Sequence, residues 1–242
     1  MKNLTKYVTL AALALASSAV FADDKVVLES HYPVGANYAL RLSGTVSIQG
    51  SDANLTGLIN VKVISDKDGV ITSQQNSSQM SININGQDMQ IPQGPDRFEE
   101  SNAQGAILKI KGDGVQPTEY QSAYLTQIVF SKDAVGVGDT WTYTYPANST
   151  LQIAKTTNTY KILSIKTVDG VKCFEVQVDD ESTVDSQAAS VKGTAYIDMA
   201  NGQMVKFSQV WTNVPTAGSP MPVSGTFTIE KVLSSTKSSG GN

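Results

Sequence analysis

Hydrophobic and polar residues alternate along most of this chain, in short runs. From residue 38 to residue 48 the apolar positions are Tyr38, Leu40, Leu42, Val46 and Ile48, and polar residues stand between most of them. A period of two residues places alternate side chains on opposite faces of a β-strand. The pattern therefore predicts antiparallel strands with one apolar face and one wet face.

Similar runs recur in both halves of the chain. They are centred on residues 55–63, 80–84, 141–145, 174–178, 195–197, 205–211 and 223–229. The dipeptides typical of tight hairpin turns are Asp68-Gly69, Asn85-Gly86, Asp169-Gly170 and Asn201-Gly202. We predict an all-β fold with a curved antiparallel sheet, either a half-barrel or two packed β-modules, because the apolar face must be hidden from water.

One segment departs from the alternation. After Pro117 and Tyr120, the residues Ala123, Tyr124 and Ile128 follow at spacings that place them on one side of a helix. Proline is also favoured in the first helical turn. We predict one short helix here, which either plugs or caps the sheet or forms a plain surface linker.

Two stretches rich in proline and glycine interrupt the strands, at residues 91–95 and 215–222. Proline cannot donate a hydrogen bond to a sheet, so neither stretch is a central strand. We predict long loops, which serve either as binding loops or as simple crossovers.

A short phrase occurs twice, as Val34-Gly35-Ala36-Asn37-Tyr38 and as Val137-Gly138-Asp139-Thr140-Trp141. Each copy is followed, about 30 residues later, by an Asp-Gly-Val turn. This spacing predicts an internal duplication of a β-module of roughly one hundred residues. The resulting division is a signal peptide at 1–22, a first β-module at 23–112, a helical connector at 113–135, a second β-module at 136–233 and a flexible tail at 234–242.

The first 22 residues have the pattern of a cleaved signal peptide. Lys2 and Lys6 precede a short apolar run from Val8 to Leu15, and Val20-Phe21-Ala22 fits a signal peptidase site. The run is too short to span a bilayer. We expect a periplasmic or secreted bacterial protein with no integral membrane segment after cleavage; the alternative is an uncleaved amphipathic N-terminus.

The net charge and the small number of potentially catalytic or metal-binding residues argue against several classes of function. Removal of the signal peptide changes the net charge from −4 to −6, which argues against a nucleic-acid partner and against charge-driven binding to anionic membranes. His31 is the only histidine and Cys173 the only cysteine, too few for a zinc site. No Gly-x-Ser-x-Gly elbow accompanies His31. We therefore predict a protein that is not an enzyme, without catalytic residues, cofactor or metal.

The remaining candidates have ordinary interpretations. Cys173 is expected to be a strand cysteine, with a disulfide between chains as the alternative. The pair Glu99-Glu100 and the run Asp179-Asp180-Glu181 are expected to be solvated charge, with loose calcium binding as the alternative. The methionines lack the clustering of a copper site and are expected to fill gaps beside apolar residues.

Several motifs of the second half resemble those of a poorly characterised group of secreted bacterial β-proteins. They are Gly136–Trp141, Tyr160–Leu163, Val168–Val171, Tyr196–Asp198 and Asn201–Lys206. More distantly, the chain is similar to the periplasmic lipoprotein and lipid carriers of the Lol type. That resemblance implies an unclosed barrel whose concave apolar face is covered by helices, although this chain offers one helical segment and no matching ligand residue.

From the sequence we expect one of two functions. The first is a binding module whose concave face holds a lipid or another apolar small molecule. The candidate apolar ligand face consists of Trp141, Tyr143, Phe174, Phe207 and Trp211. The alternative is a structural or interaction module with a filled core, whose loops meet another envelope protein.

Overall fold

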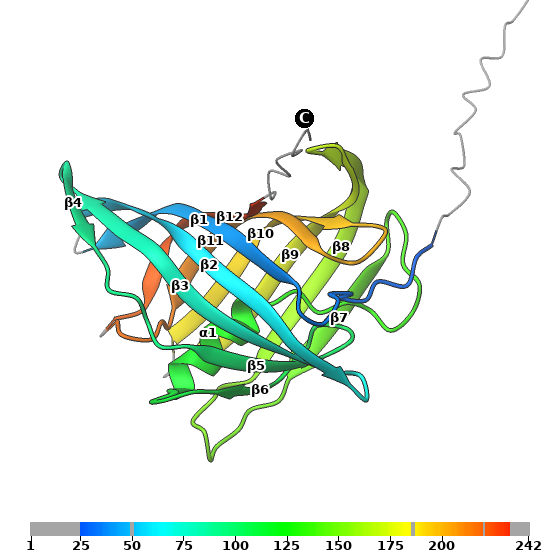
Figure 1. The fold of residues 1–242 in the computed structure, drawn as a ribbon, viewed down its shortest axis with the longest axis horizontal. Helices are drawn as coiled ribbons and strands as arrows, with labels where there is room; N and C mark the ends of the chain where they lie inside the picture. The colour runs from blue at the N-terminus through cyan, green and yellow to red at the C-terminus, as the bar shows by residue number, and fades with distance from the viewer. Residues whose placement is uncertain (1–24, 49–50, 185–186, 220, 233–242) are drawn as a thin grey trace, which may run out of the picture.

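The computed structural model describes residues 25–48, 51–184, 187–219 and 221–232 (Figure 1). The predicted signal peptide and the predicted tail lie outside these described residues. In chain order the elements are β1 (Asn37–Ile48), β2 (Ser51–Lys67), β3 (Val70–Ile84), β4 (Gln87–Gln90), β5 (Arg97–Asn102), β6 (Ile107–Lys111), α1 (Pro117–Thr126), β7 (Thr140–Tyr145), β8 (Thr156–Val168), β9 (Val171–Val184), β10 (Gln187–Asp198), β11 (Met204–Val214) and β12 (Val223–Val232). The prediction of an all-β fold with one short helix is confirmed.

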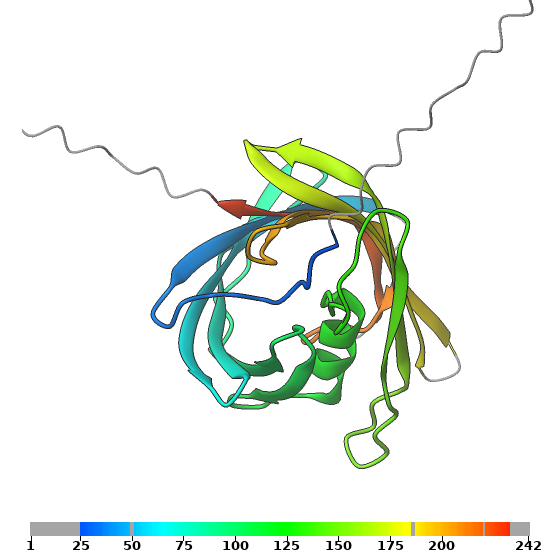
Figure 2. The same cartoon turned by 90° about the vertical axis from the view of Figure 1, so that its right-hand side faces the viewer.

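The twelve strands found among the described residues belong to one antiparallel sheet. Its order is β6-β5-β3-β2-β1-β12-β11-β10-β9-β8-β7, and β4 pairs with β3 beside this path. The last strand therefore returns to the first, with Leu42 opposite Ile229. The two predicted modules are joined edge to edge as one continuous sheet, which curls around α1 (Figure 2). Of the two predicted architectures, the chain adopts the half-barrel.

Three of the four predicted hairpin turns have the backbone that a two-residue turn requires. The prediction for Asn201-Gly202 was wrong, because this pair lies within a longer connection between Asp198 and Met204 and only its glycine has a positive φ. Asp169 and Gly170 join β8 to β9 with φ angles of 50° and 81°. Positive φ at both positions is typical of type I′ turns, whose twist matches that of the strands. Asp68-Gly69 and Asn85-Gly86 have the same pair of positive φ angles.

Register shifts and close contacts bend the strands into the curl. β2 and β3 change register twice, between Thr56 and Leu58 and between Val63 and Ser65. Such bulges bend a strand and increase its twist. At Gly44 the strand β12 approaches so closely that a Cβ would lie 2.4 Å from the carbonyl oxygen of Thr226. Glycine is therefore required at this point of β1.

Helix α1 lies inside the curl rather than on its surface, so the surface-linker alternative is wrong. Pro117 occupies the first turn, and Glu119 accepts a hydrogen bond from the Gln116 backbone at 3.1 Å. Leu125 is fully buried. At the other end, Asn158 donates to the carbonyl of Tyr124 at 2.8 Å and Tyr160 donates to that of Gln127 at 3.0 Å. Side chains of β8 thus satisfy carbonyls that a helix end leaves free.

Tyrosine side chains cap the edge strand β6. The backbone N–H of Ile107 donates to the hydroxyl of Tyr145 on β7, the other edge strand, at 3.0 Å. The hydroxyl of Tyr120 accepts from the N–H of Ile110 at 3.0 Å and donates to its carbonyl at 2.9 Å. These contacts connect the two edges through side chains and occupy backbone groups that an edge strand would otherwise offer to another chain.

Candidate functional site

A cavity of about 360 Å³ lies between α1 and the inner face of the sheet. One wall is apolar and comes from the strands around the β1–β12 junction: Leu40, Ile59, Val61, Phe207, Trp211 and Ile229. The neighbouring wall comes from β3 and β5 and, beside Ile71, carries polar side chains: Ser73, Gln75, Glu99 and Ser101. From α1, Ser122 and Thr126 also line the cavity. The space is therefore amphipathic.

Residues 25–33, which we call the N-terminal strap, run across one end of the curl (Figure 2). Val26 pairs with Val135 through two backbone hydrogen bonds of 3.0 and 2.9 Å. Further along, the N–H of Ser30 donates to the carbonyl of Ala103 at 2.9 Å, and that of His31 donates to Asn201 at 3.1 Å. The strap is thus bound to the connector, to the β5–β6 hairpin and to the β10–β11 turn.

The strap contributes directly to the cavity. Ser30 and Tyr32 belong to its lining, and the ring of Tyr32 stacks on that of Tyr38 with centroids 4.8 Å apart. Burial raises the pKa of Tyr32 and of Tyr38. Both phenols are therefore neutral at ordinary pH and serve as hydrogen-bonding groups at the strap end of the cavity.

Glu99 is the only residue with a formal charge among the described residues that line the cavity. Burial raises the pKa of its carboxyl to about 7, and a hydrogen bond from Gln75 partly opposes this shift. The interpretation of Glu99 as solvated charge was wrong, whereas its neighbour Glu100 forms an ion pair with Lys111. Alternate residues of a strand face opposite sides, so once β5 is recognised one of the two carboxylates must point inward.

The predicted apolar ligand face is divided by the structure. Phe207 and Trp211 line the cavity. Trp141, Tyr143 and Phe174 lie with the hydrophobic core around α1 instead. The indole N–H of Trp141 donates to the carbonyl of Val129 at 2.8 Å, and Phe174 is fully buried. These three side chains therefore support the helix and the connector that follows it.

A second buried carboxyl lies under the helix, and the interpretation of Asp180 as solvated charge was wrong. Asp180 on β9 is fully buried beside Asn158 on β8, its direct cross-strand neighbour. Burial raises the pKa of Asp180 to about 9; the adjacent Asn158 lowers it by less, and the charge of Asp179 raises it further. Within the described part of the chain, neither carboxyl oxygen of Asp180 has a hydrogen-bond partner of ordinary geometry. Asp180 is therefore neutral at pH 7 in the folded protein.

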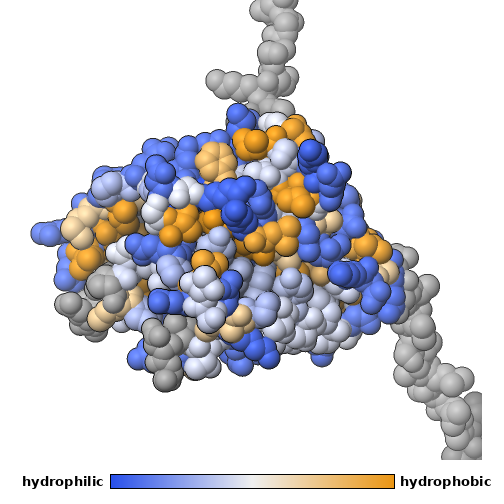
Figure 3. All heavy atoms as spheres, turned by 90° about the horizontal axis from the view of Figure 1, so that it is seen from below, coloured by the Kyte–Doolittle hydropathy of each residue, from blue (hydrophilic) through white to orange (hydrophobic). Residues whose placement is uncertain are grey.

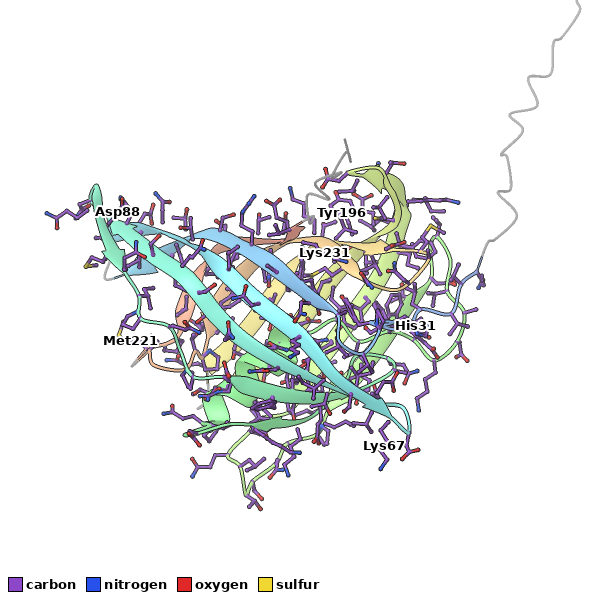
Figure 4. All side chains as sticks on the ribbon, in the orientation of Figure 1. His31, Lys67, Asp88, Tyr196, Met221 and Lys231 are labelled. Atoms are coloured by element: carbon purple, nitrogen blue, oxygen red, sulfur yellow. The ribbon has the colours of Figure 1, made fainter. Side chains whose placement is uncertain are left out.

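His31 and Cys173, the other residues with potential chemical roles, do not lie together in one site. His31 is exposed on the strap, 3.3 Å from Glu29. Figure 4 places it at the opposite end of the molecule from Met221 and Asp88. Cys173 is fully buried as a free thiol whose pKa is raised to about 11, first by burial. Over the described ranges, no group of three or more His, Cys, Asp or Glu side chains is placed to hold a metal ion.

The outer surface is mixed in character. On the face seen from below, hydrophobic residues form several small patches between hydrophilic ones (Figure 3). Among the residues that the structure describes, no helix combines the length and the apolar character that a membrane span requires.

Comparisons with known proteins found distant structural similarity alone. No protein-family model and no curated protein matches this chain. The hypothetical lipoprotein YmcC of Escherichia coli is similar at 16% identity over 84% of this chain and 91% of that chain, with a TM-score of 0.32. A Bacteroides fragilis protein described as having a YmcC-like fold is similar at 9% identity over 86% of this chain and 100% of that chain, also with a TM-score of 0.32.

These neighbours agree with the predicted resemblance to poorly characterised bacterial proteins. A likeness of this size supports no inference about function. The more distant resemblance to the lipid carriers stays a prediction.

Proposed function

We propose that this protein is a non-catalytic binding protein of the bacterial envelope or exterior, which holds one small apolar or amphipathic molecule inside its curved sheet. The cavity of about 360 Å³ carries this proposal. Ligand sites typically measure about 300–1,000 Å³ and combine an apolar lining with a few polar groups. The predicted signal peptide supports the location.

The two walls suggest how such a molecule would be oriented. Its apolar body would lie against Leu40, Ile59 and Phe207, where burial of apolar surface stabilises a complex by about 25 cal/mol per Å². Its polar group would face the wall that carries Gln75 and Glu99. A polar group left in the apolar wall would lose its hydrogen bonds with water, which is costly.

The alternative is a structural or interaction module with a filled interior. The region around α1 fits this description, because Tyr160, Ile162 and Phe174 are completely buried there. The cavity beside β3 and β5 favours the binding protein, because a purely structural core gains stability when such a space is filled.

Binding of an uncharged fluorescent probe, N-phenyl-1-naphthylamine, to the purified protein tests the proposal. We expect saturable fluorescence enhancement at one site per chain. Organic extraction of protein purified from its native host, followed by mass spectrometry, would then identify a stoichiometric ligand. Absence of both probe binding and extracted ligand would reject the proposal.

A pair of phenylalanine substitutions locates the site. Ser101→Phe places an aromatic ring in the cavity, and we expect it to weaken probe binding at least about tenfold. Leu108→Phe on the neighbouring strand adds the same ring at a position that is 51% exposed. This control should bind the probe like the unmodified protein; equal weakening in both variants would place the probe outside the cavity.

A further inference from the structure

The single charge in the cavity indicates what kind of polar group the ligand carries. Glu99 lies opposite Ser73 on β3 and opposite Ile110 on β6, so it is held between two neighbouring strands. Around it on the polar wall are hydroxyl and amide groups from Ser73, Gln75 and Ser101. No lysine or arginine belongs to the described lining of the cavity. The carboxylate therefore has no counter-charge inside this space.

The basic residue closest along the strand is already engaged. Arg97 also lies on β5, and its guanidinium donates two hydrogen bonds to the carboxylate of Glu119 on α1, one of them 3.0 Å long. The ionisable groups that face Glu99 from other elements are tyrosines. The negative charge of Glu99 contributes to the raised pKa of Tyr38 on β1 and of Tyr145 on β7. These phenols can donate hydrogen bonds, but they bring no positive charge.

We propose that the cavity binds an apolar molecule with one ammonium group, which pairs with the carboxylate of Glu99. This inference rests on the proposed function and adds the chemical class of the ligand. The ammonium group has three N–H donors, of which one reaches Glu99 and the others find acceptors in the hydroxyl of Ser101 and the amide oxygen of Gln75. A ligand with a carboxylate, such as a fatty acid, would bring a second negative charge beside Glu99 and is disfavoured.

Three ligands with the same eight-carbon chain test the charge preference: n-octylamine, n-octanol and octanoate. Each is titrated into the protein at pH 8, where Glu99 is largely ionised. We expect octylamine to bind at least about tenfold more tightly than octanol, and octanoate to bind most weakly. Glu99→Gln should remove the preference for octylamine over octanol.

Glu100→Gln is the matched control. Glu100 stands next on the same strand and forms an ion pair with Lys111, with its side chain 25% exposed. This variant should keep the full preference for octylamine. Loss of the preference in both variants would attribute it to the overall negative charge of the protein and overturn the proposal.

A measurement on the unmodified protein makes the test independent of any variant. Near pH 7 about half of the Glu99 carboxyl groups are protonated, so pairing with an ammonium group releases up to about half a proton. Calorimetric titration in buffers of different ionisation enthalpy measures the number of protons released per ligand bound. Octanol should release none.

The outcomes separate the two proposals. Equal binding of octylamine and octanol, or octylamine binding without proton release, rejects the ammonium ligand and leaves the binding cavity in place. Failure of all three compounds to bind, together with failure of the neutral probe, rejects the binding function itself.

Discussion

The first half of the sheet, β1–β6, and the second half, β7–β12, begin with the same backbone arrangement. The N–H of Gly35 donates to Val63 at 2.9 Å, and the N–H of Gly138 donates to Ile162 at 2.8 Å. In return, Val63 donates to the carbonyl of Ala36 and Ile162 to that of Asp139, both at 3.0 Å. The repeated Val-Gly phrase of the sequence thus starts each half with equivalent hydrogen bonds.

The interiors of the two halves nevertheless differ. Inward-facing positions of β8 and β9 carry large apolar side chains such as Tyr160, Ile162 and Phe174, all completely buried. On β3 and β5, Ser73, Gln75 and Glu99 line the cavity. Short polar side chains do not fill the space under a curved sheet as aromatic rings do. The interior is therefore packed under β8 and β9, whereas a cavity remains under β3 and β5, which Phe207 and Trp211 of β11 also line.

The largest expected effect is the loss of a core ring from the second half. Phe174→Ala should lower the free energy of unfolding by about 3–5 kcal/mol, because the void is surrounded by close-packed atoms. Leu40→Ala, at the border of the existing cavity, should cost about 1–2 kcal/mol. Urea unfolding of both variants measures the difference. Equal losses would show that the two interiors are packed alike.

The second-largest expected effect on stability concerns the N-terminal strap, which lines one end of the cavity. At Gly202 a Cβ would lie 2.1 Å from the carbonyl oxygen of Glu29, and φ is +66°. Gly202→Ala should therefore cost about 2–3 kcal/mol and speed hydrogen exchange at the amides of Ser30 and His31.

Gly170→Ala is the control for Gly202→Ala. Its φ is +81°, but nothing lies within 4 Å of the added Cβ. It should cost about 1 kcal/mol from backbone strain alone and leave exchange in the strap unchanged. Similar exchange in the two variants would contradict a close contact between strap and turn.

The third effect tests the buried carboxyl of the second half. The folded-state pKa of Asp180, about 9, exceeds its ordinary value of 3.8, so the folded protein binds more protons than the unfolded chain between these pH values. The free energy of unfolding should therefore fall as the pH rises from about 4 to about 9. Asp180→Asn should remove most of this decline and stabilise the protein at pH 8 by about 1–3 kcal/mol.

Chemical unfolding from pH 4 to pH 9 checks this prediction. Asp179→Asn is the matched control, because Asp179 points outward and pairs with Lys192 at 3.0 Å. It should change stability far less than Asp180→Asn, because the charge of Asp179 is a minor cause of the raised pKa of Asp180. A gain from Asp179→Asn as large as that from Asp180→Asn, or a flat pH profile of the unmodified protein, would contradict a neutral Asp180.

The smallest effect belongs to Glu99. The pKa of its carboxyl is raised from 4.5 to about 7 in the folded protein. Its contribution to the free energy of unfolding should therefore fall as the pH rises from about 4.5 to 7 and stay constant above that range. Glu99→Gln should remove this part of the decline, by about 1–2 kcal/mol at pH 8, because the carboxylate borders the cavity and is less tightly enclosed than Asp180. The difference between Glu99→Gln and the unmodified protein, followed over the same pH range, measures the contribution. A decline between pH 4.5 and 7 that is as steep in Glu99→Gln as in the unmodified protein would contradict a contribution from Glu99.

Much of the fold was predictable from the sequence. Strict alternation around Leu40 and around Tyr143 predicted β1 and β7, and Asp169-Gly170 predicted the hairpin of β8 and β9. Pro117 predicted the start of α1. The residues 91–95, 215–219 and 221–222 of the predicted loops are confirmed outside any strand. These features depend on local backbone preferences and on the period of two, which neighbouring residues determine.

The candidate site was less predictable. The segment 97–111 carries few large apolar residues in alternation, so β5 and β6 were not recognised and Glu99 was assigned to solvent. The aromatic residues of the second half were grouped as one ligand face. The contacts of Trp141 and Phe174 with the α1 core depend on where the helix packs.

The sequence by itself determined most of the strands, three of the tight turns, the single helix and the amphipathic character of the sheet, because these follow from side-chain periodicity and from the φ angles that glycine, asparagine and aspartate allow. The tertiary structure alone decided that β1 pairs with β12, that α1 fills the second half, and that Glu99 faces a cavity closed at one end by the strap. These features arise from contacts between residues far apart in the chain. The energies of these contacts depend on shape, burial and the absence of a nearby counter-charge. The pattern of residues along the chain does not predict these properties.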